Sequence, residues 1–437
     1  MSSSVNTAPG HTDITREERF AGVQKRTMTV LIITQIVGTL GLGVAPTIAV
    51  LIAGDVTQNE AWAGLARTAS TLGAALLGIP LGNLAAKFGR RVALSSGWWL
   101  AAIGTAILVI AAEKSLIVPL FAGLLLLGAG AATSLQSRFT ATDLAKPKNK
   151  ARSLALIVWV GTIGSVIGPN IGIPGAYVGE MLGLSVYAAS FLLATIFLLI
   201  AGTVIFVMLR PDPLLVLMED SAKSATASTA SQSTPAPQTR KKGSIRNALA
   251  LLRTNKPARI AVIAILVAQV VMASIMTMTP VHIMHEGGTV GLVGVTISTH
   301  VLGMFAFSPL SGWVVDKFGH RAAMWIGVGI FMLSLVLAAG WQSNMGFILA
   351  SLFFLGLGWS FVNISGSALF TSAVPDEGRA SSQGGVDAMS NLFGATASFL
   401  AGPLLALTNF SVLSVLAMFI LIPLVLVIVR RIPLVEQ

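Results

Sequence analysis

Three ionisable side chains lie inside long apolar stretches of this sequence: Arg67, His300 and Asp387. A charge at the centre of a bilayer costs about 3 kcal/mol or more, so each should face a cavity or a partner. Gln383 and Asn391 flank Asp387 at i−4 and i+4 and would share its helical face. Asp387 could therefore bind and release a proton during a transport cycle. The alternative is a structural carboxylate tied to an arginine or to helix-end amides.

The other two residues also allow two interpretations each. His300 could carry a proton, because an imidazole titrates near physiological pH, or it could be a hydrogen-bonded packing residue. Arg67 lies only about a turn and a half inside its stretch. It could extend its charged end to the surface or attract an anionic group of a substrate. Uncharged polar side chains in other stretches are further candidates for substrate or proton binding: Gln35, Asn170, Asn363 and Asn391.

Enzyme chemistry and metal binding find little support. His282, His285 and Glu286 are close in sequence, but no further ligand set accompanies them. The chain contains no cysteine, which excludes disulfides and thiolate chemistry. It has no nucleotide-binding loop and no nucleophile elbow. We therefore expect no metal, no cofactor and no enzymatic activity.

Composition indicates a polytopic helical membrane protein. Hydrophobic residues make up 54% of the chain and charged residues only 10%. Apolar runs of about 20 residues recur, which is the length that crosses the hydrocarbon core as a helix. Twelve spans are predicted, at about 27–53, 62–85, 92–112, 116–135, 154–173, 184–209, 258–284, 291–315, 322–340, 345–371, 382–407 and 412–429.

The Lys and Arg residues that give the net charge of +11 lie mainly in the loops, so the charge does not indicate a nucleic-acid-binding surface. With the N-terminus inside, nearly all loop Lys and Arg residues fall on the inner side, and the outer loops hold only Lys114. Cytoplasmic loops are enriched in Lys and Arg, so this pattern predicts cytoplasmic termini in a multi-pass protein of the cell membrane. Lipid is thus the expected surrounding, and no nucleic-acid partner is expected.

One charged hairpin occurs twice. Gly82–Arg91 reads GNLAAKFGRR and Gly312–Arg321 reads GWVVDKFGHR, and the two copies are 230 positions apart. Each copy ends one apolar run and begins the next. A charged hairpin repeated half a chain apart indicates two homologous membrane halves.

These residues resemble the cytoplasmic loop signature of the major facilitator superfamily, a large class of secondary transporters. The resemblance implies two six-helix halves and a latch that stabilises the outward-facing state, here Asp316 with Arg152. The first copy departs from the pattern because Ala86 replaces the acidic residue, which leaves Arg379 without its usual partner. The residues implied in gating are Gly82, Lys87, Gly89, Arg90, Arg91, Arg152, Gly312, Asp316, Lys317, Gly319, Arg321 and Arg379.

A second motif lies in the fifth predicted span, GTIGSVIGPNIG at Gly161–Gly172. Small residues four apart allow close helix packing, and proline can kink a helix. The motif resembles an element of the superfamily's antiporters, through Gly164, Gly168, Pro169 and Gly172. Close packing without directional meaning is the alternative. Two exporter features are missing: Leu124 stands where an arginine is expected, and the first span has no acidic residue.

The predicted domains are an N-terminal tail (1–26), a six-helix bundle (27–209), a cytoplasmic linker (210–256), a second bundle (257–430) and a tail (431–437). The linker should contain a flexible segment at 219–243 and a short amphipathic helix at 244–253. The function we predict is export of a small organic compound by proton antiport, performed by a monomer with alternating access. An importer or facilitator without antiport is the alternative, and a non-transporting sensor is a third possibility.

Overall fold

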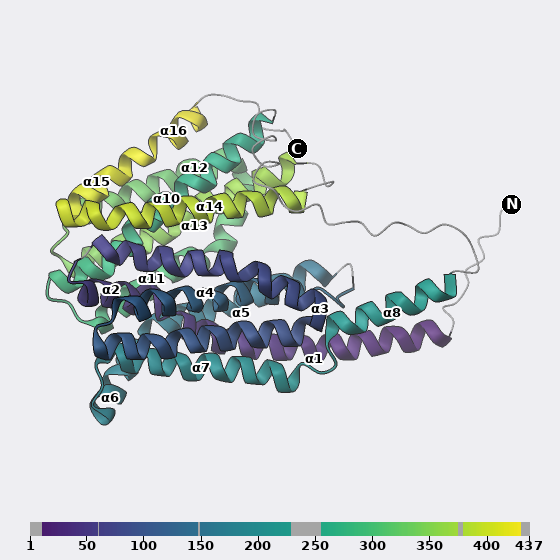
Figure 1. Ribbon diagram of the computed structural model, residues 1–437. Helices are drawn as coiled ribbons and strands as arrows, with labels where there is room; N and C mark the ends of the chain where they lie inside the picture. Colours follow the sequence, from purple (N-terminus) through teal and green to yellow (C-terminus); the bar gives the residue numbers. More distant parts are fainter. Residues whose placement is uncertain (1–10, 60, 147–148, 229–254, 375–378, 430–437) are drawn as a thin grey trace.

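The computed structural model describes residues 11–59, 61–146, 149–228, 255–374 and 379–429, and in these residues the regular structure is helical (Figure 1). A membrane leaves backbone groups no water to bond, so helices that satisfy their own amides are the expected solution. The N-terminal half comprises α1 (His11–Leu42), the π-helix η1 (Ala45–Ala49), α2 (Val50–Thr57), α3 (Ala61–Lys114), α4 (Ile117–Thr140), α5 (Lys150–Ile167), the 3₁₀ helix η3 (Gly168–Ile171), α6 (Gly172–Leu182), α7 (Val186–Met208) and α8 (Pro213–Ser228). The C-terminal half comprises α10 (Lys256–His285), α11 (Val290–Phe305), α12 (Ser308–Gly340), α13 (Met345–Ala373), α14 (Arg379–Leu407), α15 (Phe410–Ile420) and α16 (Ile422–Val429).

Ten continuous segments of the described chain are long and apolar enough to cross a membrane. Two of them, of 53 and 51 residues, would each be about 80 Å long if straight, far more than the roughly 30 Å of hydrocarbon. Each contains one glycine with positive φ, Gly89 at 87° and Gly319 at 81°. A Cβ built on Gly97 would lie 3.1 Å from Leu81 Cδ1, so the chain folds back on itself at Gly89. The count of twelve spans stays a prediction, and this geometry supports it.

Each half has its own apolar core. In the N-terminal half Trp98 and Phe191 are completely buried among aliphatic side chains of the surrounding helices. In the C-terminal half Phe331, Phe370 and Phe410 occupy comparable positions. Figure 1 shows the two halves as neighbouring groups of helices, coloured purple to teal and green to yellow.

We call the end of the bundle that carries Gly89 and Gly319 the motif end. The halves contact each other in the part of the helices away from this end. Thr68 Oγ1 donates to the Ala395 carbonyl oxygen at 3.0 Å, and Asn170 Nδ2 donates to Ser298 Oγ at 2.6 Å. The core of the C-terminal half also includes Val50 and Ala63 of the N-terminal half. These contacts close the bundle at the end opposite the motifs.

The linker differs from the prediction in one part. Residues 219–228 were expected to be flexible but belong to helix α8, which Asp212 caps by accepting hydrogen bonds from the amides of Leu214 and Leu215. The start of α1 runs beside α8, where Val23 and Val216 share an apolar cluster (Figure 1). At the start of residues 219–228, Glu219 pairs with Arg19 of α1, with Nη2 and Oε2 3.5 Å apart. Residues 229–243 and the predicted amphipathic helix lie outside the described residues.

Candidate functional site

The two motif loops share one backbone geometry. Gly89 and Gly319 hold the same position in the two copies, and both have a φ that only glycine adopts without strain. This agreement supports the repeat inferred from the sequence. Gly89 has a second reason to be glycine, because an added Cβ would collide with the carboxylate of Asp212.

Two aspartates that the sequence analysis did not single out hold the first loop. Arg90 forms a bidentate ion pair with Asp143, with Nε–Oδ2 and Nη2–Oδ1 distances of 2.8 and 3.2 Å. The amide of Arg91 donates to Asp212 Oδ2 at 2.7 Å. Both carboxylates come from other connections of the same half, after α4 and before α8. An acidic residue inside a basic loop, and an aspartate before a helix-starting proline, were signals that could have identified them.

The second loop has a different environment. Lys317 lies over the rings of Trp313 and Phe318, at 4.8 and 5.4 Å from their centroids. Asp316 is exposed, and within the described residues it forms no ion pair with Arg152. The latch predicted from the resemblance concerns the outward-facing state, so it stays a prediction. Arg379 begins α14, but its side chain is outside the described part. The remaining motif residues Gly82, Lys87, Gly312 and Arg321 lie at the same end of the bundle.

The glycine motif bends the fifth span as its proline suggests. The α-helix ends at Ile167, and the chain continues as the 3₁₀ turn η3. Gly164 packs against α1, where a Cβ would lie 2.6 Å from the Ile36 carbonyl oxygen. Gly172 faces Val290 of the other half, so the bend brings α6 and α11 together. Pro169 and Gly168 are buried at this junction.

Asn170 of the same motif joins the two halves. Its side-chain amide donates to Ser298 Oγ of α11, and the Ser298 hydroxyl in turn donates to the Val166 carbonyl oxygen at 2.5 Å. Gln35 is instead only 2% exposed and donates to Ser134 Oγ at 2.6 Å within its own half. Its Oε1 is buried and has no hydrogen-bond partner in the described part of the chain, so a role of Gln35 in binding stays a prediction. Asn363 lies half-buried in α13.

Asp387 lies about two turns into α14, and Gln383, Asn391 and Asp387 are all exposed on this helix. The carboxylate of Asp387 makes no hydrogen bond or ion pair with the described residues, but it interacts electrostatically with Arg138 of α4. The Nε of Arg138 is buried and has no hydrogen-bond partner in the described part of the chain. The structure thus places two opposite charges, one from each half, near each other without a salt bridge. The sequence analysis did not single out Arg138 and missed this relation.

Arg67 and His300 form a second pair that interacts electrostatically between the halves. The charge of Arg67 on α3 acts on the imidazole of His300 on α11, although the two residues belong to different halves. His300 is completely buried, and its Nδ1 lies 2.9 Å from the Leu352 carbonyl oxygen. Arg67 is half-buried rather than extended to the surface.

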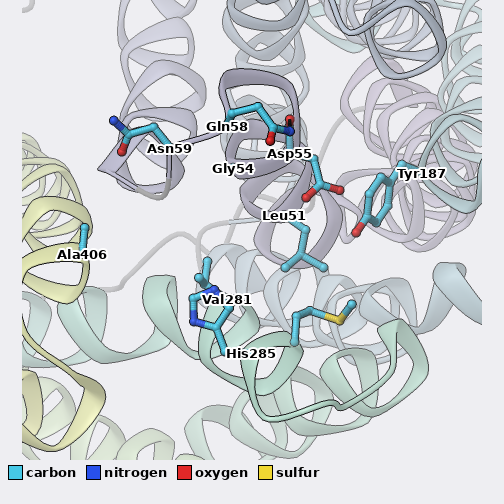
Figure 2. A pocket seen from close by; sticks show the side chains of 10 residues that line it. Leu51, Gly54, Asp55, Gln58, Asn59, Tyr187, Val281, His285 and Ala406 are labelled. Atoms are coloured by element: carbon cyan, nitrogen blue, oxygen red, sulfur yellow. Dashed lines mark hydrogen bonds between the residues drawn. The ribbon is translucent and has the colours of Figure 1, made fainter.

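A cavity of about 510 Å³ lies at the end opposite the motifs (Figure 2). Both halves line it, through α2, α7, α10 and α14. Asp55 and Tyr187 point toward one another there, with His285 on the facing helix (Figure 2). The His282 ring stacks on Phe410, with ring centroids 4.3 Å apart, and its Nε2 lies 2.7 Å from the Gln342 carbonyl oxygen. No group of three or more metal-ligating residues occurs in the described part of the chain.

Comparison with known proteins identifies the family. The family model of the Major Facilitator Superfamily matches residues 30–290 and 261–436. The chain is 34% identical over 415 residues to the uncharacterized MFS-type transporter YdeG of Bacillus subtilis, covering 94% of this chain and 93% of YdeG. It is 27% identical over 416 residues to the riboflavin transporter RfnT of Brucella anthropi, covering 93% and 96%. The crystal structure of the nucleoside transporter NupG superposes with a TM-score of 0.65 at 15% identity, over 92% of this chain and 97% of NupG.

The repeated loop, the paired halves and these matches agree with one another. The protein is a transporter rather than an enzyme, and it spans a membrane several times. This chain belongs to the major facilitator superfamily.

Proposed function

We propose that this transporter exports a small organic compound in exchange for protons, by alternating access between the two halves. The observation that carries the proposal is the pair Arg138 and Asp387, which belong to different halves and interact electrostatically without an ion pair. An ionised Asp387 attracts Arg138, and a protonated one does not. Proton occupancy would thereby change the relative stability of two arrangements of the halves.

The direction of the cycle follows from where the pair lies. The positive-inside pattern supports a cytoplasmic motif end, and the contacts between the halves away from that end support an inward-facing arrangement. Loss of the proton to the cytoplasm would then favour closure of the motif end and exposure of the substrate outside. Protonation of Asp387 from outside would weaken its attraction to Arg138 and return the transporter to the inward-facing arrangement. Export against proton entry results when proton and substrate exclude each other.

Asp387 suits the role of carrier better than His300. A carbonyl oxygen only accepts hydrogen bonds, so His300 Nδ1 must carry the hydrogen in its bond to Leu352. A second proton on the ring would leave an unpaired Nε2–H buried near the charge of Arg67. The neutral ring fits this environment, whereas Asp387 has no bond that would have to break.

Vesicle transport tests the proposal. The purified protein in proteoliposomes is given a panel of compounds, beginning with riboflavin because of the named relative, and a pH-sensitive dye reports proton movement. Export by antiport predicts that the substrate moves uphill only with a proton gradient, and that adding it to one side moves protons in the opposite direction. Equilibration independent of the gradient would instead establish a facilitator. Asp387→Asn should abolish uphill movement and retain substrate binding, while Glu180→Gln, an exposed carboxylate of α6, serves as the matched control.

A further inference from the structure

The cavity at the end opposite the motifs is built jointly by the two halves (Figure 2). Its volume of about 510 Å³ is in the range of small-molecule sites. α2 supplies Gly54 and Asp55 to its wall, and α10 of the other half supplies Met284 and His285. α2 and α10 also contact each other directly, and Val50 of α2 is buried in the core of the C-terminal half. The cavity therefore keeps this shape only while the halves are together at this end.

The wall combines apolar surface with one carboxylate. Leu51, Val281 and Met284 supply the apolar part, and none of the described lining residues is Lys or Arg. Asp55 and Tyr187 point toward one another, which places an aromatic ring beside the carboxylate (Figure 2). An organic cation suits this combination, because its charge is attracted by a carboxylate and by an aromatic ring while its hydrocarbon part covers apolar surface.

The charge around the cavity also favours a cation. The whole chain has a net charge of +11, but its distribution is uneven. The described helix ends and connections at this end contain Asp55, Glu113, Glu180 and Glu286, whereas Lys114 is their only Lys or Arg. A cleft surrounded by charges of one sign concentrates ions of the opposite sign. The surroundings therefore attract cations and repel anions.

We propose that this cavity binds a small organic cation of the quaternary ammonium class, with Asp55 as its counter-charge, and that the bound cation holds the halves together at this end. A cation that touches α2 and α10 at once loses part of its contacts when these helices separate. It therefore binds the closed arrangement more tightly and shifts the equilibrium toward it. The cation is thus an inhibitor of the transport cycle and not the transported compound. Its binding rests on the cavity, and only the inhibition rests on the alternating access of the proposed function.

Equilibrium binding in detergent tests the cation site. The protein in dodecyl maltoside, at constant ionic strength and at pH 8, where imidazole is ordinarily neutral, is titrated with choline and with its neutral isostere 3,3-dimethylbutan-1-ol. Thermal stabilisation gives the affinities. We expect choline to bind about tenfold more tightly than the alcohol, the size of one charge pair that is partly screened by solvent, and Asp55→Asn to remove this difference. Benzyltrimethylammonium should bind more tightly than choline, because it covers more apolar surface.

Matched variants separate the roles of charge and space. Glu180→Gln removes another exposed carboxylate at the same end, outside the cavity wall, and should bind choline like the wild type. Asp55→Glu keeps the charge and should retain most of the affinity. A Cβ on Gly54 meets no atom within 4 Å, so Gly54→Leu has room to extend into the cavity and should weaken benzyltrimethylammonium more than choline. The melting temperature of each variant without ligand reports on folding.

Thiol labelling tests whether the cation holds the halves together. Ala63 is completely buried in the core of the C-terminal half and is not part of the cavity wall, so a cysteine there (Ala63→Cys) reacts with a water-soluble reagent only when the halves separate. A ligand that binds only the closed arrangement slows this reaction by the factor 1 + [L]/Kd, about tenfold at ten times the dissociation constant. Choline should not slow labelling when Asp55→Asn is added, nor at the exposed control position Val118→Cys.

The outcomes distinguish this site from the proposed function. Equal binding of choline and 3,3-dimethylbutan-1-ol, or full choline affinity in Asp55→Asn, would overturn the cation site. Unchanged labelling of Ala63→Cys with choline bound, or uphill transport of choline in vesicles, would overturn its inhibitory role. Because binding and labelling need neither a proton gradient nor a transported compound, failure of antiport would leave them intact. Conversely, proton-driven export by a protein that does not bind choline or benzyltrimethylammonium would support the proposed function and reject this site.

Discussion

The relation between Arg138 and Asp387 allows a quantitative prediction about conformation. Two unit charges about 4 Å apart attract each other by about 4 kcal/mol at an effective dielectric constant of about 20, and by about 2 kcal/mol at twice that distance. A closure of the motif end that brings the two charges from about 8 to about 4 Å would therefore gain about 2 kcal/mol, or about 30-fold in population. Exposure of Asp387 to solvent makes this an upper bound.

Spin-label distances measure this change without any substrate. The chain has no cysteine, so cysteines introduced at Phe139 on α4 and Ser372 on α13 would label the motif end alone, and a second pair at Val118 and Phe347 would report the other end. The attraction exists only while Asp387 is ionised. Raising the pH through its titration should therefore shorten the Phe139–Ser372 distance and lengthen the other, and lowering it should do the reverse.

Variants decide whether the pair causes the shift. Asp387→Asn should remove the pH-dependent closure of the motif end, Arg138→Gln should do the same, and the double variant should add no further effect, because both changes remove one interaction. Glu180→Gln should behave like the wild type. A pH-dependent shift that persists in Asp387→Asn would refute the reasoning, and its loss in His300→Ala alone would move the titrating group to the histidine.

Two further predictions concern the loops. If Asp316 and Arg152 form the latch of the outward-facing state, Asp316→Asn should reduce transport several-fold with unchanged expression, and the charge swap of Asp316→Arg with Arg152→Asp should restore part of it; wild-type transport by Asp316→Asn would reject the latch. If the motif end is cytoplasmic, a cysteine at Ser224 should resist an impermeant thiol reagent added to intact cells and react once the membrane is permeabilised. Labelling from outside would contradict the predicted topology.

The local features of this protein could be predicted from the sequence because few residues specify each of them. Apolar runs of sufficient length predict membrane helices, since a helix is the structure that satisfies its own backbone in lipid. Gly89 and Gly319 indicate the sharp turns, because a positive φ is accessible to glycine and costly for other residues. Pro169 likewise indicates the bend in the fifth span, where its ring and missing amide interrupt the helix.

Relations between helices were decided by the tertiary structure. Arg138 and Asp387 are 249 positions apart, and no periodicity indicates that they interact electrostatically across the two halves. Asp212 looks like a linker residue until its bond to the amide of Arg91 is seen. The sequence places Gln35 inside an apolar run, but only the structure shows that its amide donates to Ser134 of α4. A side chain's role in a bundle depends on which helix its face meets, and that is set by the packing of all the helices together rather than by the residues beside it in the chain.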